Sequence, residues 1–476
     1  MAEVLFPPRP ALPEPMSRDA LYVAPPPPAP APEPAPVVAF QPPPPAAPPS
    51  SAPPSSAPPS SAAPSSAAPS SAAPSPAAPI AAAPPPATAA QPAAPPAPPP
   101  LAELVEVPDL AADAVAVERP GFWAGQRLRL PVLPPAAPTP PLPLIDGTAP
   151  FAEGWLDTWH RQATIGAPRD VGCYFLCDAV VSGTGQVWLQ DRLVTAPEVM
   201  PPYLHGLIGL PHDPQHVLRV TQLPVREIAH PCAVLFGGMH VYGHLLIETL
   251  FHVLLVRHAL RGTGLGCRYL LPRSAAPWAL RMLQEDIGIA ADDIEFYDPA
   301  TERVRLHQAI LPAVTLTDAF HPAADALLTA WLDALALPPS PAPEARRLFL
   351  TRGHFRNPHS GNRVCTNEAA LAEYAATRHG FVAVAMETLP WRAQIALMRQ
   401  AEIIVGQFGS AMHGALFARP GTRVAVMGFA NLVQSQIAAL RGQRMAYMTR
   451  HIDLAGDFTI DAASFAGFLD QVCAAA

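Results

Sequence analysis

The sequence contains no lysine, and this absence excludes several kinds of active site. All 30 basic residues are arginine. A Walker-type phosphate-binding loop needs a lysine at the phosphates, and Schiff-base and pyridoxal phosphate enzymes need a lysine amine. The formal net charge is −8. The chain therefore lacks the basic excess that is typical of nucleic-acid-binding proteins, and we expect no nucleic acid partner.

Cysteines are few and scattered, and no long apolar run is free of polar residues. Of the six cysteines only Cys173 and Cys177 lie four apart, so no zinc-binding pattern is complete and we expect free thiols in a reducing compartment. Residues 1–15 lack the basic region and apolar run of a signal peptide, which predicts a cytoplasmic protein, free or peripheral at the inner membrane face. Residues 234–260 carry four histidines, a glutamate and an arginine. This composition predicts a buried helix and no transmembrane segment.

Proline, alanine and serine dominate the first part of the chain. Residues 1–110 are predicted to form a disordered Pro/Ala/Ser-rich tail of low complexity, because such a composition has little apolar surface to offset the entropy of ordering. Residues 111–150 are transitional. The remainder is divided by the proline-rich residues 335–345, which predicts an N-terminal lobe at 151–335 and a C-terminal lobe at 346–476.

The folded part alternates between strand and helix patterns. Residues 172–190 predict a hairpin around a Ser-Gly-Thr-Gly turn, and a long helix is predicted near 241–261. In the C-terminal lobe, short β-branched runs alternate with helical segments, two of which end at glycine or a polar turn. This alternation predicts an α/β fold with two Rossmann-like lobes and a cleft between them, where ligands bind at the carboxyl ends of the strands.

Two polar turns in the C-terminal lobe point to a bound ligand. Residues 352–368 carry several arginines and three of the four asparagines in the chain, directly after a predicted strand. Residues 406–413, GQFGSAMH, follow the strand EIIV. Arginine side chains and free backbone N–H groups at strand-to-helix turns suit a phosphate-bearing ligand.

Several ordered motifs between residues 172 and 447 resemble glycosyltransferase family 61, in particular its bacterial capsular polysaccharide biosynthesis branch. Tyr242-Gly-His244-Leu-Leu-Ile-Glu248 resembles the family's Tyr-x-His-Trp-x-x-Glu helix. Leu350-Thr-Arg352, followed by Arg363-Val-Cys-Thr-Asn367-Glu368, resembles its Ser-Arg … Arg-x-x-x-Asn-Glu block. Further pieces are the hairpin VSGTGQVWLQD, the step from Leu389 to Gln394, and Gly406-x-x-Gly409-Ser-Ala with Phe417 and Pro420-Gly421.

The chain also departs from this family pattern. Phe408 stands where the family's Gly-x-His-Gly motif has histidine, and the glutamate that closes the strand after Pro-Gly is absent from VAVMG. His413, four residues after the second glycine, lies near the family's following asparagine position. These departures keep a second hypothesis open, in which the folded part is a non-catalytic binding or scaffold module on a transferase fold.

The resemblance implies a GT-B-like enzyme that moves a sugar, with inversion, from a nucleotide-diphosphate donor to a saccharide or glycoconjugate acceptor, in polysaccharide or capsule biosynthesis. No DxD-type acidic pair follows a strand of the C-terminal lobe, so we expect no metal and no cofactor beyond the nucleotide sugar itself. The residues expected to bind the donor are Arg352, Arg363, Asn367, Glu368, Gln394, Gly406, Gly409, Ser410 and His413.

His244 and Glu248 are the expected catalytic pair. Residues four apart share a helix face, and a histidine next to a carboxylate can accept the acceptor hydroxyl's proton. The pattern does not decide which of the two is the base, and a structural pair within the helix is the alternative. His240 and His252 extend the same face, where a structural role is favoured.

Several of the expected donor-binding residues also have structural alternatives. Arg352 and Arg363 could form surface ion pairs, and Asn367 with Glu368 could cap a helix. Gln394 could be an ordinary exposed helix residue. Gly406 and Gly409 most simply permit a tight turn.

Overall fold

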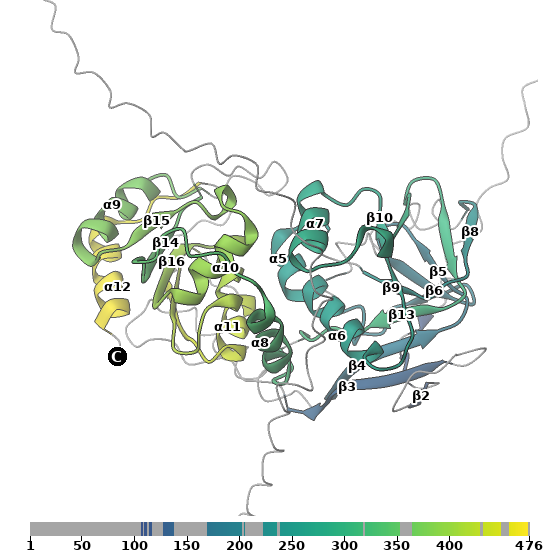
Figure 1. Ribbon diagram of the computed structural model, residues 1–476. Helices are drawn as coiled ribbons and strands as arrows, with labels where there is room; N and C mark the ends of the chain where they lie inside the picture. Colours follow the sequence, from purple (N-terminus) through teal and green to yellow (C-terminus); the bar gives the residue numbers. More distant parts are fainter. Residues whose placement is uncertain are drawn as a thin grey trace, which may run out of the picture. The chain divides into compact units, whose positions relative to one another are not determined.

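The computed structural model describes residues 106–107, 109–111, 114–116, 127–137, 169–201, 204, 222–235, 239–317, 319–352, 364–428, 432–448 and 457–474. Within these ranges the chain forms three β-sheets with helices packed on them, a mixed α/β architecture (Figure 1). Residues 1–105, which make up nearly all of the predicted tail, lie outside the described ranges. The prediction of disorder therefore stays a prediction.

A six-stranded sheet has the strand order β1-β7-β6-β5-β12-β8. Its centre is the predicted hairpin: β5 pairs antiparallel with β6, and Gly183 in the turn has a φ of 53°. The strands are β1 (Glu106–Val107), β5 (Ala179–Ser182), β6 (Gln186–Leu189), β7 (Arg192–Val194), β8 (Val225–Ile228) and β12 (Arg303–Leu306).

A seven-stranded sheet follows the order β11-β10-β9-β13-β4-β3-β2. Four neighbouring strands, β11 to β13 in that order, are parallel, and β9, β10 and β11 are joined by helical crossovers. Antiparallel β4 and β3 extend this core. The strands are β2 (Val115–Ala116), β3 (Leu128–Ala136), β4 (Arg169–Leu176), β9 (Cys232–Val234), β10 (Arg268–Pro272), β11 (Ile294–Tyr297) and β13 (Ala309–Pro312).

The third sheet is wholly parallel and has the order β15-β14-β16-β17-β18. Numbered along the chain this is 2-1-3-4-5, the doubly wound order whose switch point lies between the first and third strands. The strands are β14 (Arg347–Leu350), β15 (Val382–Val384), β16 (Ile403–Gln407), β17 (Arg423–Met427) and β18 (Arg444–Met448).

Helices cover both faces of the parallel sheet. Buried side chains of α9 and α12 share one apolar cluster with Phe349, whereas α10, α11 and η7 pack with Leu348 and Leu350 from the opposite face (Figure 1). The helices of this part are α9 (Glu368–His379), η6 (Met386–Thr388), α10 (Trp391–Gln400), η7 (Ser410–Phe417), α11 (Leu432–Leu440) and α12 (Ala462–Ala474).

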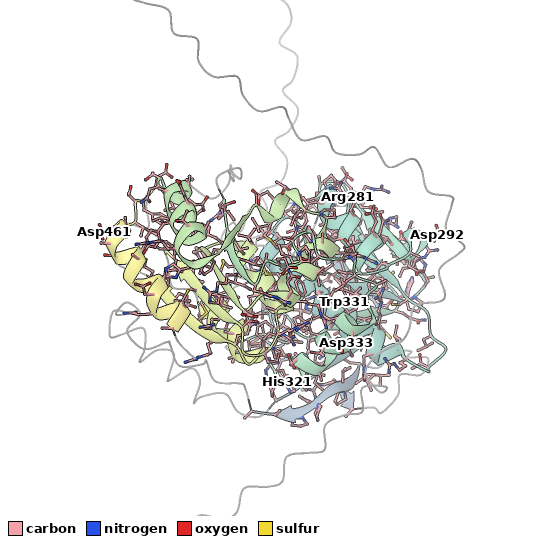
Figure 2. All side chains as sticks on the ribbon, turned by 60° about the vertical axis from the view of Figure 1, so that its left-hand side comes forward. Arg281, Asp292, His321, Trp331, Asp333 and Asp461 are labelled. Atoms are coloured by element: carbon pink, nitrogen blue, oxygen red, sulfur yellow. The ribbon has the colours of Figure 1, made fainter. Side chains whose placement is uncertain are left out.

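The helices of the preceding part share one core with α10, α11 and η7. They are α5 (Tyr242–His244), η3 (Leu245–Thr249), α6 (Leu250–Leu260), α7 (Pro277–Arg281), η4 (Met282–Asp286), η5 (Ala291–Asp293) and α8 (Ala324–Ala334). Trp331 of α8, labelled in Figure 2, lies 5.8 Å from the ring of Trp391 and 6.3 Å from that of Phe417. This aromatic cluster joins the part before residue 335 to the parallel sheet.

The structure departs from the predicted fold before residue 335. The C-terminal lobe has the expected Rossmann-like parallel sheet, but in the first lobe four adjacent parallel strands are extended by antiparallel β4, and a second sheet has mixed parallel and antiparallel pairing. The segment CYFLCDAVV, within the predicted β-rich hairpin region, is divided between β4 and β5, which belong to different sheets. The break lies at Asp178, whose φ of 55° reverses the chain.

Candidate active site

Arg352 lies at the switch point of the parallel sheet. It follows β14, and its Nη1 donates a 2.6 Å hydrogen bond to the carbonyl of Phe408, just beyond β16. A β-carbon placed on Gly409 would lie 2.7 Å from the same Nη1. Glycine at 409 is therefore what lets a guanidinium cross the gap between the first and third strands, which is where doubly wound sheets bind ligands.

Glu368 holds the backbone at this point. Its buried carboxylate accepts the N–H of Arg352 at 2.9 and 3.1 Å. Asn367 occupies the N-cap position of α9 without a capping side-chain bond. Instead its amide bonds the N–H and carbonyl of Ile460, at 3.1 and 2.7 Å. Both side chains thus act on backbone groups: Glu368 positions Arg352, and Asn367 fastens the segment before α12.

The turn after β16 forms η7, a 3₁₀ helix of eight residues. Runs of 3₁₀ helix longer than three or four residues are uncommon, because their hydrogen bonds have poor geometry. Two buried glutamines bond its carbonyls: Gln434 Nε2 donates to Met412 at 3.0 Å, and Gln443 Nε2 to Ala415 at 2.7 Å. These external bonds stabilise a conformation that local sequence does not favour.

His244 and Glu248 are joined by a hydrogen bond of 3.1 Å between Nδ1 and Oε2. Glu248 lies in η3, a π-helical turn within the long helix, and such turns occur frequently at functional sites. The Glu248 side chain is fully buried, whereas that of His244 is 26% exposed. A neutral imidazole that donates Nδ1–H to an ionised carboxylate keeps the lone pair on Nε2, and the contact between Nδ1 and Oε2 fits this arrangement.

Gly243 brings this pair into contact with η7. A β-carbon on Gly243 would lie 2.5 Å from Nδ1 of His413 and 3.1 Å from Oγ of Ser410. The first turn of η7 therefore touches α5 on one side and, through Gly409, the guanidinium of Arg352 on the other. Residues that the sequence placed in separate motifs form one continuous site.

His413 is an unusual member of this site. Neither ring nitrogen has a partner with hydrogen-bond geometry within the described residues, and both are shielded from water. Burial, together with a smaller contribution from the neighbouring His244, lowers the pKa of His413 to about 4, and the Gly243 backbone acts in the opposite direction. The imidazole is therefore neutral at physiological pH.

Gln394 and Tyr242 connect the α5 helix to α10. The Tyr242 hydroxyl donates to Oε1 of Gln394 at 3.0 Å and accepts from Nε1 of Trp391 at 3.1 Å. Nε2 of Gln394 donates to the Leu389 carbonyl at 2.9 Å. Gln394 therefore uses its amide to position the helix that carries His244.

The remaining predicted residues have different settings. Arg363 lies outside the described residues, as does His354. Gly406 is within β16, and a β-carbon there would lie 2.7 Å from Sδ of Met412. His240 is exposed. His252 is fully buried, and burial lowers its pKa to about 3.

The histidine-rich helix is a core element. Its 19 residues, Tyr242–Leu260, are apolar enough by length and composition to cross a membrane, but most of that stretch is buried inside the protein, which is typical of a soluble core helix. Among the residues that the structure describes, no group of three or more His, Cys, Asp or Glu side chains could hold a metal ion.

Sequence reasoning missed three features of the site: the glutamines that support η7, the Tyr242–Gln394 bond, and the role of Gly243. A signal for the last was present. Glycine within a helix costs about 1 kcal/mol relative to alanine, so a helix-internal glycine often marks a close approach.

The comparison with known families agrees with this geometry. Residues 242–425 match the family described as Glycosyltransferase 61. This range begins at Tyr242 of α5, ends in β17, and contains Gly243, His244, Glu248, Arg352, Glu368, Gln394 and His413. No curated protein matches the chain. Residues 242–425 therefore form a glycosyltransferase family 61 domain, and the protein is a glycosyltransferase.

Proposed function

We propose that the enzyme transfers a sugar from a nucleotide-diphosphate donor to a saccharide or glycoconjugate acceptor, with inversion and without a metal ion. The observation that carries this proposal is the continuity of the site. The short helix η7 contacts Gly243 of α5, the helix that carries the candidate base His244. At Gly409, where η7 begins, it contacts Arg352, the candidate phosphate-binding cation. Transfer of a sugar from a diphosphate to a hydroxyl group needs a base and a phosphate-binding cation within one site.

His244 is the better candidate for the base. Its Nε2 holds a lone pair, and its side chain is partly exposed while that of Glu248 is not. The acceptor hydroxyl attacks the anomeric carbon opposite the departing diphosphate, and its proton passes to Nε2. In this proposal Glu248 orients the ring and stabilises the imidazolium that forms.

The diphosphate is assigned to the switch point. The first N–H groups of a helix have no intrahelical partner, and here they lie beside the guanidinium of Arg352. Negative charge that develops on the leaving group would meet this positive end. Glu368 contributes indirectly through the Arg352 backbone.

The wider setting of the reaction follows the family resemblance. We propose a GT-B-like arrangement, in which the four parallel strands around β9 supply the acceptor side and the sheet of β14 to β18 the donor side. His244 follows β9, and Arg352 follows β14, so both halves present residues beyond the carboxyl ends of strands. Polysaccharide or capsule biosynthesis in the cytoplasm or at the inner membrane face is the corresponding role.

A donor screen tests the proposal. The full chain is mixed with UDP-glucose, UDP-N-acetylglucosamine, GDP-mannose, UDP and GDP, and thermal stability and release of nucleoside diphosphate are measured. We expect at least one nucleotide sugar to raise Tm and to be turned over, equally with magnesium and with a chelator. Absence of binding by every nucleotide would contradict the donor assignment. A strict need for magnesium would contradict the metal-free mechanism.

A further inference from the structure

Buried polar groups in proteins almost always have hydrogen-bond partners, and His413 is an exception that calls for an explanation. Leaving one buried donor or acceptor unpaired costs about 1–3 kcal/mol. Both nitrogens of His413 lack a partner within the described residues. The same ring is pressed against Gly243, where any larger residue would collide with it. The fold thus loses stability at the unpaired ring nitrogens, and it restricts position 243 to glycine, to keep an imidazole at this position.

A second buried histidine shows what a purely structural histidine looks like in this chain. His321 Nε2 lies 2.9 Å from the Pro134 carbonyl and 3.1 Å from that of Arg169, and its Nδ1 accepts the N–H of Ala323. Both ring nitrogens are used, and they join β3, β4 and the start of α8. His413 makes no comparable bonds, so stabilising the fold does not account for it.

Within the described residues no hydrogen bond of normal geometry holds the His413 ring, although the Gly243 backbone is close enough to raise its pKa. Its contacts are with the Gly243 backbone and with the neighbourhood of Ser410 and His244. A neutral imidazole carries one donor and one acceptor, which matches the two-sided hydrogen bonding of a hydroxyl group. His244, the group that would receive the reacting proton, lies next to it.

We propose that His413 forms its hydrogen bonds only in the substrate complex, with a sugar hydroxyl next to the reacting one, and that Gly243 is kept small to give the ring this position. The inference deepens the proposed function and rests on it. The hydroxyl belongs either to the transferred sugar or to the acceptor sugar. Either source accounts for a polar group that the free protein leaves unpaired.

The test compares His413→Leu with two matched histidine variants. His321→Leu removes a fully bonded buried histidine, and His240→Leu removes an exposed one four residues before His244. In the free protein we expect His413→Leu to melt at or above the wild-type temperature, because an apolar group replaces an unpaired polar one. His321→Leu should melt several degrees lower, and His240→Leu should be unchanged.

Turnover gives the second readout. On the nucleotide sugar found in the donor screen, we expect His413→Leu to lose about tenfold or more in turnover, the equivalent of one hydrogen bond. His413→Gln, which keeps a donor and an acceptor, should recover part of it. Gly243→Ala should reduce turnover like His413→Leu, and combining the two should add little, because both displace the same ring.

Binding separates the two hydroxyl sources. Weaker binding of the nucleotide sugar with unchanged binding of UDP or GDP assigns the bond to the donor sugar; unchanged binding of both with lost turnover assigns it to the acceptor. If the wild-type protein is active and His413→Leu keeps full turnover, the inference is overturned while the proposed function stands. A loss of Tm in His413→Leu equal to that in His321→Leu would have the same consequence. A wild-type protein that neither binds nor turns over any nucleotide sugar would instead overturn the proposed function, and the inference with it.

Discussion

The regions around His321 and His413 use the same residue type in opposite ways. Around His321, which Figure 2 labels, three backbone groups from β3, β4 and α8 satisfy the imidazole. Around His413, the glutamines Gln434 and Gln443 donate hydrogen bonds to η7 carbonyls and none to the imidazole. In the first region, the histidine forms hydrogen bonds that stabilise the fold. In the second region, the fold positions a histidine whose hydrogen bonds we assign to the substrate complex. Sites of function are where such local cost is expected.

The strongest test of this contrast is removal of the catalytic pair. We expect His244→Ala and Glu248→Gln each to lower turnover by about 10²-fold or more, the scale of general-base catalysis. Nucleotide binding should persist, because Arg352 and η7 are untouched. Steady-state turnover and Tm measured on the same samples separate catalysis from stability.

Two outcomes would break the contrast. If both variants stay folded with near-normal transfer rates, the pair is not catalytic and His413 becomes the candidate base. If Glu248→Gln loses stability while its turnover per folded molecule stays near that of wild type, the pair is a structural element like His321.

Arg352→Ala is expected to have the next largest effect. It removes the guanidinium at the switch point and should weaken nucleoside diphosphate binding by about 1.5–3 kcal/mol, the range for hydrogen bonds to charged groups. Isothermal titration with UDP or GDP measures this directly. Arg399→Ala is a suitable control, because Arg399 pairs with Asp333 at the protein surface. Equal affinity of wild type and Arg352→Ala would remove the phosphate assignment.

Much of the parallel sheet could be predicted from the sequence, because its strands and helices carry strong periodicity. The patterns predicted α9, which ends at Gly380 in the left-handed conformation, and the strands β14, β16 and β17. Hydrophobic alternation does not reveal sheet partners across long separations. The antiparallel extension by β3 and β4 therefore remained hidden.

The site was predictable only in part, for a similar reason. His244, Glu248 and Arg352 stand in local motifs, but the meeting of Gly243 with His413 depends on how two distant helices pack. The π turn of η3 and the 3₁₀ helix of η7 depend on tertiary bonds, such as those from Gln434 and Gln443, which no local propensity encodes. The bonds from the Asn367 amide to Ile460 likewise depend on a segment far away in the sequence, so its place in the local motif did not indicate them.

Acid titration should sharpen the comparison by a smaller amount. His413 has a pKa of about 4 in the folded protein and an ordinary value near 6.5 when unfolded. Between these values the unfolded chain binds the proton and the folded one does not, so stability falls as pH drops from about 6.5 to 4, by at most about 1.4 kcal/mol per pH unit. His244 lies next to His413 and lowers its pKa, and buried His252, whose pKa is about 3, contributes a loss of stability of the same sign.

His413→Leu removes one of these contributions. Its stability advantage over wild type should therefore be small at pH 7 and grow as the pH falls towards 5, as followed by urea unfolding at each pH. His252→Leu serves as the parallel case, because His252 is a fully buried histidine in α6. Identical pH profiles for His413→Leu and wild type would show that His413 titrates normally and is not held neutral.

The smallest effect is expected from the part of the chain outside both regions. Residues 1–100 are dominated by proline, alanine and serine, with a five-residue theme repeated between positions 48 and 75. Such a composition offers too little apolar surface to contribute to a core. Deleting residues 1–100 should leave Tm, nucleotide binding and turnover almost unchanged, and the difference between His413→Leu and His321→Leu should be the same in the shortened chain. A fall in Tm of several degrees would show that the segment packs on the folded part. A change in turnover alone, at constant Tm, would place the segment near the substrates instead. The His413 and His321 variants would then have to be compared in the full chain only.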